Sequence, residues 1–299
     1  MVSNPYENLW IYYLQGVIRD NEVENIISIY GQGFDNNSSF IGNWEEDGFS
    51  FLFFSASSDE VVQRIIEQSK DLNLIDKYEM TGEAWHGEAI ESYTSGSLCI
   101  SPPWKIPFVN KPNLKHILLD PGVIFGTGRH PTTEDCLSYI EYVCSNQYYS
   151  ISTAIDIGTG TGLLAIAAAK LGCRKILALD FNLLAVKTAQ KNIRLNSLED
   201  KILAIQGRAE DFVSLPADLV VANIHYDVMS RFFDIPEFFQ HKWLILSGLL
   251  RSEVNKVLDK LIKERVTVVE TVSPDGVWNT ILAKGNSNVS CNCKTDAKY

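Results

Sequence analysis

The residue types and spacing best suited to chemistry occur in AIDIGTGTGLLAIAAAKLG, residues 154–172. An apolar run leads to Asp156, glycines follow at positions 158, 160 and 162, and a helical pattern begins at once. Glycine lets the backbone turn tightly and approach a ligand without a Cβ in the way. The helix start supplies free N–H groups and a positive dipole end. Asp156, Gly158, Gly160 and Gly162 are therefore candidate ligand-binding residues.

A second acidic residue, Asp180, ends the next apolar run, KILALD at 175–180. A carboxylate there could accept hydrogen bonds from both hydroxyls of a ribose, or it could cap the helix expected at 182–196. The dinucleotide pattern G-x-G-x-x-G would require glycine at position 163, where this chain has Leu163. The pattern present is D-x-G-x-G-x-G, which resembles motif I of the class I S-adenosylmethionine methyltransferases.

Asn223 lies near the end of a further apolar run, in ADLVVANIHY at 217–226. Ligands in open α/β sheets bind beyond the carboxyl ends of the strands, so this side chain should face the ligand. The segment resembles motif IV of the amine methyltransferases, commonly N-P-P-Y, with Ile224 and His225 replacing the prolines and Tyr226 retained. The resemblance implies that Asn223 and Tyr226 are catalytic, that Asn223 holds the target amine, and that an aliphatic amine fits better than a flat aromatic one. His225 could accept a proton or serve only in shape and hydrogen bonding.

The turn after the third strand candidate offers two more acidic residues, in GRAEDF at 207–212. In this kind of fold that turn contacts adenine, so Glu210 or Asp211 could accept a hydrogen bond from the adenine amino group. A plain surface turn is the alternative interpretation.

The segment LLDPGVIFGTGRHPTT, residues 118–133, makes the resemblance specific. It is similar to LDPG-x-x-FGTG-x-HPTT of the PrmA-type ribosomal protein methyltransferases, which modify the eleventh protein of the large ribosomal subunit. SPPW precedes it, and DIGTGTGLLAIAAAKLG, VVANI and LILSGLL follow in the family's order. The resemblance covers about residues 83–283.

This resemblance implies a methyl-donor site for S-adenosylmethionine. The second threonine of HPTT, Thr133, corresponds to the family's donor-binding threonine, and Phe125 and Thr127 belong to the loop expected to cover the donor. The expected donor-binding residues are Phe125, Thr127, Thr133, Asp156, Gly158, Gly160, Gly162, Asp180 and Asn223.

The implied reaction is transfer of a methyl group to a lysine or N-terminal amine of a large-subunit ribosomal protein. Two alternatives remain open: a methyltransferase of the same fold that acts on another protein or a small molecule, and a non-catalytic regulator that binds S-adenosylmethionine.

Residues 1–80 contain short alternating elements. Strand patterns at 9–16, 38–44, 48–54 and 75–80 and helical patterns at 22–31 and 57–70 give the order βαββαβ. This order is that of a ferredoxin-like split βαβ unit. Residues 81–120, rich in Trp, Gly, Ser and Pro, are predicted to be a linker of extended and turn conformations.

From residue 121 a larger α/β domain is predicted, a seven-stranded doubly wound class I methyltransferase domain that ends at 285 and is followed by a disordered tail at 286–299. Repeated βα units require such a parallel sheet, and the last two strands form a closing hairpin. The strand candidates are 153–158, 175–180, 201–206, 217–224, 243–248, 266–272 and 279–285, and the helix candidates are 132–145, 162–172, 182–196, 227–240 and 250–264.

The net charge of −11 comes from 37 acidic and 26 basic residues. Residues 1–80 hold 14 acidic and 4 basic residues, a balance of −10, so nearly all of the excess lies in the N-terminal unit. Proteins that grip nucleic acid through phosphates carry a basic stripe, so direct nucleic-acid binding is not expected. The charge permits a basic protein partner, or it serves only to keep a small domain soluble.

The cysteine and hydropathy patterns predict a reducing, cytoplasmic setting and no membrane association. Six cysteines lack regular spacing, the first ten residues do not resemble a signal peptide, and the longest apolar stretch, 163–172, is too short to span a bilayer. His130 and His225 occur in no spacing typical of metal ligands, so no metal is expected.

Overall fold

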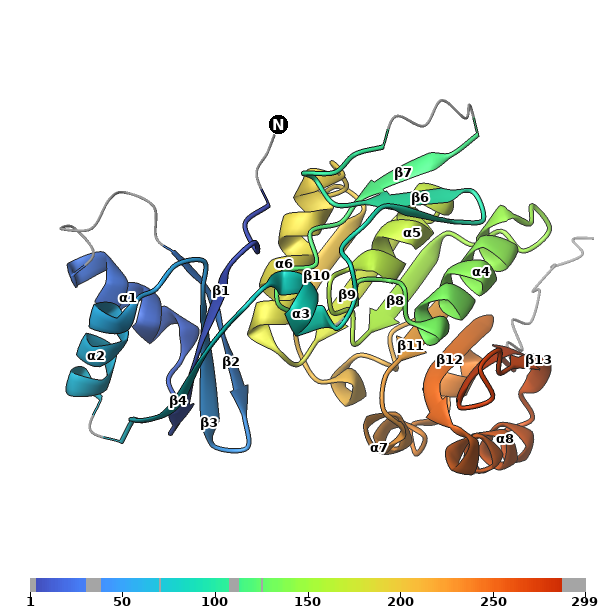
Figure 1. Ribbon diagram of the computed structural model, residues 1–299. Helices are drawn as coiled ribbons and strands as arrows, with labels where there is room; N and C mark the ends of the chain where they lie inside the picture. The colour runs from blue at the N-terminus through green and yellow to red at the C-terminus, as the bar shows by residue number, and fades with distance from the viewer. Residues whose placement is uncertain (1–3, 31–38, 70, 108–112, 125, 287–299) are drawn as a thin grey trace, which may run out of the picture.

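The computed structural model describes residues 4–30, 39–69, 71–107, 113–124 and 126–286. These residues form a four-stranded, a three-stranded and a seven-stranded sheet (Figure 1). Two parts of the sequence-based predictions lie outside the described residues: Phe125, and the predicted tail apart from Asn286.

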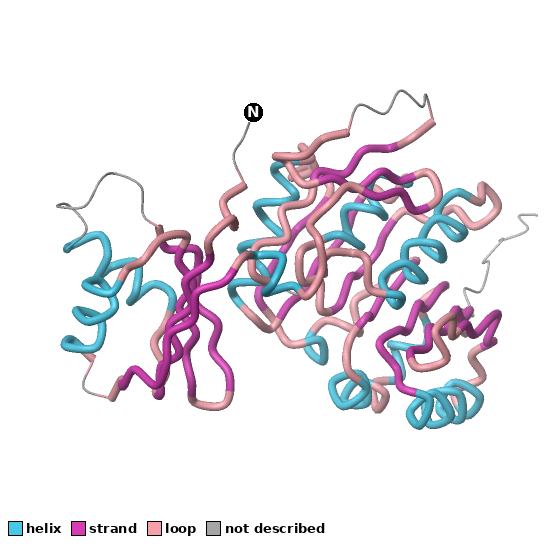
Figure 2. The backbone as a smooth tube through the Cα atoms, in the orientation of Figure 1, coloured by secondary structure: helices cyan, strands magenta, loops and turns pink. Residues whose placement is uncertain are grey.

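The N-terminal unit has the sheet order β2-β3-β1-β4 with antiparallel pairing throughout. Alternate residues of β1 point to opposite faces, so Tyr12 and Leu14 pack with α1 and α2 while Leu9 and Ile11 pack on the other side. Figure 2 shows both helices together on one side of this sheet. The elements are β1 (Leu9–Gln15), α1 (Asp20–Tyr30), β2 (Phe40–Glu46), β3 (Phe49–Phe54), α2 (Asp59–Gln68) and β4 (Asn73–Met80).

The segment predicted to be a linker carries regular structure. A short helix, α3 (Gly82–His86), is followed by β5 (Tyr93–Ser95), β6 (Leu98–Ser101) and β7 (Lys115–Leu118), which form the three-stranded sheet. Leu98 and Ile117 are fully buried and belong to the core under α4 and α5. Because buried backbone groups need hydrogen-bond partners, these extended segments pair with one another.

The large sheet has the order β10-β9-β8-β11-β12-β14-β13. β10, β9, β8, β11 and β12 are parallel, and β14 runs antiparallel to both of its neighbours. The doubly wound α/β sheet and its closing hairpin are thereby confirmed. The strands are β8 (Thr153–Ile157), β9 (Lys175–Asp180), β10 (Ile202–Gln206), β11 (Leu219–Asn223), β12 (Trp243–Leu250), β13 (Thr267–Val272) and β14 (Trp278–Lys284).

Helices cover both faces of this sheet. One apolar core lies between the sheet and α4, α5 and α6, and the other lies between the sheet and α7, the neighbouring 3₁₀ helices and α8. The helices are α4 (Pro131–Ser145), α5 (Leu163–Leu171), α6 (Leu183–Leu195), η2 (Ala209–Asp211), α7 (Tyr226–Met229), η3 (Ser230–Phe232), η4 (Pro236–Gln240) and α8 (Arg251–Lys263).

The prediction of one continuous helix over 227–240 is wrong. Three short elements, α7, η3 and η4, occupy that stretch instead. Ile235 is extended, with φ −99° and ψ 105°, as expected for a residue that precedes a proline. Pro236 has no amide hydrogen for a helical bond, so it starts a new element.

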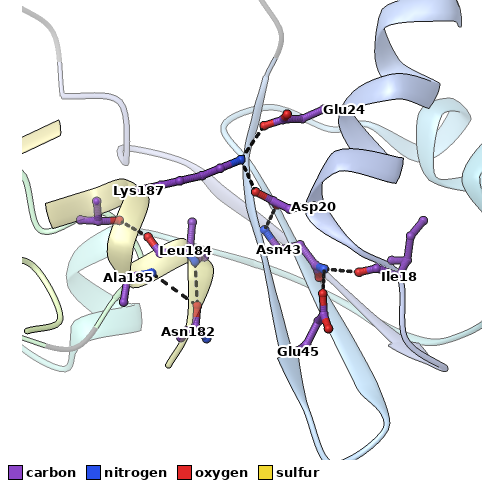
Figure 3. A network of polar contacts seen from close by, with 10 residues as sticks. Ile18, Asp20, Glu24, Asn43, Glu45, Asn182, Leu184, Ala185 and Lys187 are labelled. Carbon is purple, nitrogen blue, oxygen red and sulfur yellow. Dashed lines mark hydrogen bonds and ion pairs between the residues drawn. The ribbon is translucent and has the colours of Figure 1, made fainter. Parts of the chain in front are cut away.

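The N-terminal sheet packs directly on α6. Ile11 and Phe53 share an apolar cluster with Leu184 of that helix. Lys187 Nζ bonds to Asp20 and lies 2.8 Å from Glu24 Oε1, both on α1 (Figure 3). The N-terminal unit therefore contacts the helix that follows Asp180 through both apolar packing and ion pairs.

Candidate active site

Three adjacent parallel strands bring the main candidates to one edge of the large sheet. β8 lies between β9 and β11, and the carboxyl ends of these strands bear Asp156, Asp180 and Asn223. The chain continues from β8 to β9 on one side and reaches β11 on the other, which makes this edge a topological switch point, where α/β sheets bind ligands.

The glycine turn begins directly after β8. Gly158, Gly160 and Gly162 have φ values of 70°, 53° and 84°, a left-handed conformation that favours glycine. A Cβ on Gly158 would lie 2.3 Å from Cγ2 of Ile224, the residue after Asn223. The turn is thus pressed against the end of β11, and larger side chains would fill this space.

Asp156 lies beneath the turn and is only 2% exposed. Its Oδ2 accepts hydrogen bonds from Thr159 Oγ1 at 2.6 Å and from the Ala165 amide at 3.1 Å. Its Oδ1 is buried and has no partner among the described residues. Burial raises the pKa of this carboxyl to about 6. An unpartnered buried acceptor costs free energy, so the site fits a ligand that brings an N–H group or a positive charge.

Asp180 joins the glycine turn to the start of α6. Its Oδ2 accepts from the Gly160 amide and its Oδ1 from the Asn182 amide, both at 2.9 Å, and burial raises its pKa. The cap of α6 is Asn182, whose Oδ1 accepts from the Leu184 amide at 2.8 Å. The alternative role of Asp180 as helix cap is therefore filled by another residue.

Asn223 meets the start of α4. Its Nδ2 donates to Thr133 Oγ1 at 3.4 Å, and Thr133 is only 6% exposed. His130 caps α4, because its ring nitrogen Nδ1 accepts from the Thr132 amide. The HPTT segment and the strand-end asparagine are thus brought together.

Tyr226 is the first residue of α7 and is half-buried. Lys256 Nζ lies 5.1 Å from the centre of its ring, which links this side chain to α8. His225 is exposed and stands at the cap position of α7 without a side-chain capping bond. The structure thus links the Tyr226 ring to α8, while Asn223 bonds to α4.

The loop after Phe125 is tied to the glycine turn and to the segment that follows α3. Thr161 Oγ1 donates to the Gly126 carbonyl at 2.8 Å, and the Thr127 hydroxyl donates to the Glu88 carboxylate. Sequence reasoning missed Glu88, because no motif surrounds it and its partner is 39 residues away.

Phe181 follows Asp180 and is 74% exposed. Nearby, Glu210 forms an ion pair with Arg208 at 3.3 Å, and the exposed Asp211 shares η2 with it.

The described residues offer neither a metal-binding cluster nor a membrane-spanning helix. Within these ranges no group of three His, Cys, Asp or Glu side chains is arranged to hold a metal ion. None of the described helices combines the length and the apolar character needed to cross a membrane.

Comparison with known proteins places the chain in a family. The family model for ribosomal protein L11 methyltransferase (PrmA) matches residues 43–286. A ribosomal protein L11 methyltransferase of Exiguobacterium sibiricum is 31% identical over 259 residues, covering 81% of this chain and 80% of that protein. Its counterpart in Halalkalibacterium halodurans is 34% identical over 218 residues, covering 71% and 68%.

A solved structure agrees with these sequence matches. The crystal structure of ribosomal protein L11 methylase from Lactobacillus delbrueckii subsp. bulgaricus has a TM-score of 0.57 and 27% identity, covering 65% of this chain and 98% of that one. The chain belongs to the ribosomal protein L11 methyltransferase (PrmA) family and is a methyltransferase with the class I α/β fold.

Proposed function

We propose that this protein transfers methyl groups from S-adenosylmethionine to lysine or N-terminal amines of ribosomal protein L11. The observation that carries the proposal is the convergence of Asp156, the glycine turn, Asp180 and the Asn223–Thr133 pair at one strand edge. This arrangement supplies both a donor site and, beside it, a polar side chain for an amine.

The donor-site residues suit a nucleoside that bears a cationic amino acid. Asp156 has a free buried acceptor, the glycines leave room for close backbone approach, and Asp180 offers a carboxylate at the turn. We assign donor binding to these residues together with Thr133, Asn223, Thr127 and Phe125. S-adenosylmethionine supplies the methyl group, bound to a sulfonium that needs no further activation.

Asn223 is the residue we assign to the amine. Its side-chain oxygen can accept a hydrogen bond from an N–H group of the incoming amine and so orient the nitrogen lone pair. The attacking amine must be neutral, and lysine has an ordinary pKa of about 10.4, so the site must favour loss of a proton. Tyr226 and Ile224 stand next to it and would border the amine.

We assign protein recognition to residues 1–80. The face of the N-terminal sheet that packs on α6 through Ile11 and Phe53 continues into Tyr13 and Phe51, whose rings stack at 4.7 Å. Strand register puts Tyr78, Glu46 and Asp76 on the same face, and all three are exposed. We call this the inner face of the N-terminal sheet. The described strand residues of this face include aromatic rings and carboxylates but no lysine or arginine. Such a face suits a partner protein that presents lysine side chains.

The other boundaries are also part of the proposal. Residues 81–120 connect the two domains and add the small sheet, and 121–285 bind the donor. The described cysteines are free thiols, which supports a cytoplasmic setting, where ribosomes provide the substrate.

The test is incubation of the full chain with isotopically labelled S-adenosylmethionine and purified L11, followed by mass spectrometry of the modified peptides. We expect label on lysine or N-terminal amines of L11 and none on a second basic ribosomal protein. Label only on other proteins or on small molecules would support a different substrate. Donor binding without any product would support a regulator.

A further inference from the structure

Two buried asparagines, Asn192 of α6 and its C-cap residue Asn196, hold the extended segment that precedes the loop expected to cover the donor (the donor loop). Asn192 Oδ1 accepts from the Asp120 amide at 2.8 Å, and its Nδ2 donates to the Asp120 carbonyl at 2.9 Å. Asn196 repeats this pattern on Leu118, at 3.0 and 2.7 Å. Each side-chain amide therefore pairs with both backbone groups of one residue.

The two repeats match because helix and strand spacings coincide. Residues four apart on a helix are separated by about 6 Å along its axis. Residues two apart on an extended segment are separated by about 6.6 Å. Asn192 and Asn196 can thus form hydrogen bonds with residues 120 and 118 at the same time. A shift of the segment by one residue would break both pairs.

Only Asn192 also reaches the glycine turn. Its Nδ2 donates a second hydrogen bond to the Thr161 carbonyl at 2.8 Å, and the side chain is 0% exposed. The Thr161 hydroxyl in turn bonds to Gly126. A continuous set of bonds thus runs from Asp120 through α6 and the glycine turn to the donor loop.

We propose that Asn192 is a positioning residue for the methyl-donor site. It fixes the segment that leads into the donor loop against the glycine turn. The distance between these two segments, which border the site, is thereby held constant. The inference rests on the donor site proposed above. Removing the amide would leave the Thr161 and Asp120 carbonyls without their buried donor, a loss that would loosen these two segments.

The experiment compares Asn192→Ala with Asn196→Ala in the full chain. Calorimetry measures the Kd of S-adenosylhomocysteine, the product of the donor, and thermal unfolding measures stability. Both variants should lower Tm, because both lose buried hydrogen bonds, but only Asn192→Ala should raise Kd, by at least tenfold. A Kd change of equal size in both variants, or none in Asn192→Ala, would overturn the proposal.

A second pair keeps the test decisive if Asn192→Ala does not fold. Thr161→Val removes the hydroxyl bond to Gly126 and should raise the Kd at least fivefold, while Thr161→Ser should restore it. Thr188→Val is the control, since it removes a buried hydroxyl that bonds only within α6, to Leu184. Normal binding by Thr161→Val would contradict the proposal. Failure of the unmodified chain to bind S-adenosylhomocysteine would instead overturn the proposed donor site and this inference with it.

Discussion

Burial raises the pKa of Asp156 to about 6, and one of its carboxylate oxygens lacks a partner among the described residues. A raised pKa means that the folded state binds the proton more tightly than the unfolded state does. The folded state is therefore destabilised as pH rises from about 4 to about 6. Above that range the loss of stability no longer increases, so it is fully present at neutral pH. The donor-free protein retains a carboxylate that destabilises it, which is understandable if that charge serves ligand binding.

Relative to the unmodified protein, Asp156→Asn should therefore gain stability as pH rises from about 4 to 7.5, by up to about 3 kcal/mol at about 1.36 kcal/mol per pKa unit. This gain reflects only the charge, because the amide that replaces Oδ1 has no partner among the described residues of the donor-free site. Urea unfolding at several pH values measures it, and Asp259→Asn on the exposed side of α8 is the control. Donor affinity should fall in the same variant. A stability difference between variant and parent that does not change between pH 4 and pH 7.5 would contradict this account.

Asn223→Ala tests the assignment of the amine-binding residue. Asn223 also belongs to the proposed donor site, but that site keeps its glycine turn and both aspartates, so binding of S-adenosylhomocysteine should stay measurable and weaken far less than turnover falls. Turnover should fall by at least a factor of about one hundred, because the amine is no longer oriented. Calorimetry and a methylation assay with L11 give the two values. Unchanged turnover would exclude this role for Asn223.

At the scale of elements, the strands of the large sheet could be predicted because parallel strands buried on both faces form continuous apolar runs. The small sheet could not, because β6 and β7 pair across 17 residues, as Leu98 with Lys115 shows, and each strand is too short to show a period. The same limit applies to the site. Glycines and strand ends were visible in the sequence, whereas the contacts of Glu88 and Asn192 depend on the folded chain.

The glycine turn makes a prediction about packing between elements. Gly158→Ala combines strain at φ 70° with a contact of 2.3 Å to Ile224, whereas Gly87→Ala has φ 71° and no neighbouring atom within 4 Å. Gly87→Ala should cost about 1–2 kcal/mol for the backbone alone, and Gly158→Ala should cost more. Adding Ile224→Ala should recover about 1–3 kcal/mol by a double-mutant cycle in urea. A cycle without interaction energy would show that the turn and β11 are not tightly packed.

At the scale of the whole molecule, the N-terminal unit and the donor site share one helix. α6 begins three residues after Asp180, packs on the N-terminal sheet through Leu184, and bonds to α1 through Lys187. The proposed donor binding, the proposed support of the donor loop and the attachment of the N-terminal unit thus all involve one helix. A protein bound to the inner face of the N-terminal sheet would lie beside the helix that borders the donor site.

The charge distribution gives the final prediction. Residues 1–80 carry −10 of the net charge of −11, and exposed charges more than a Debye length apart are screened, with that length about 10 Å at 0.1 M salt and about 3 Å at 1 M. Raising salt should therefore weaken L11 binding far more than binding of S-adenosylhomocysteine, which is held at short range. The double variant Glu46→Gln/Asp76→Asn should reduce the salt dependence of the L11 Kd. The matched double variant Glu60→Gln/Glu67→Gln, on the exposed side of α2 across the sheet, should change it less. Equal salt sensitivity for protein and donor would mean that the acidic surface serves solubility alone.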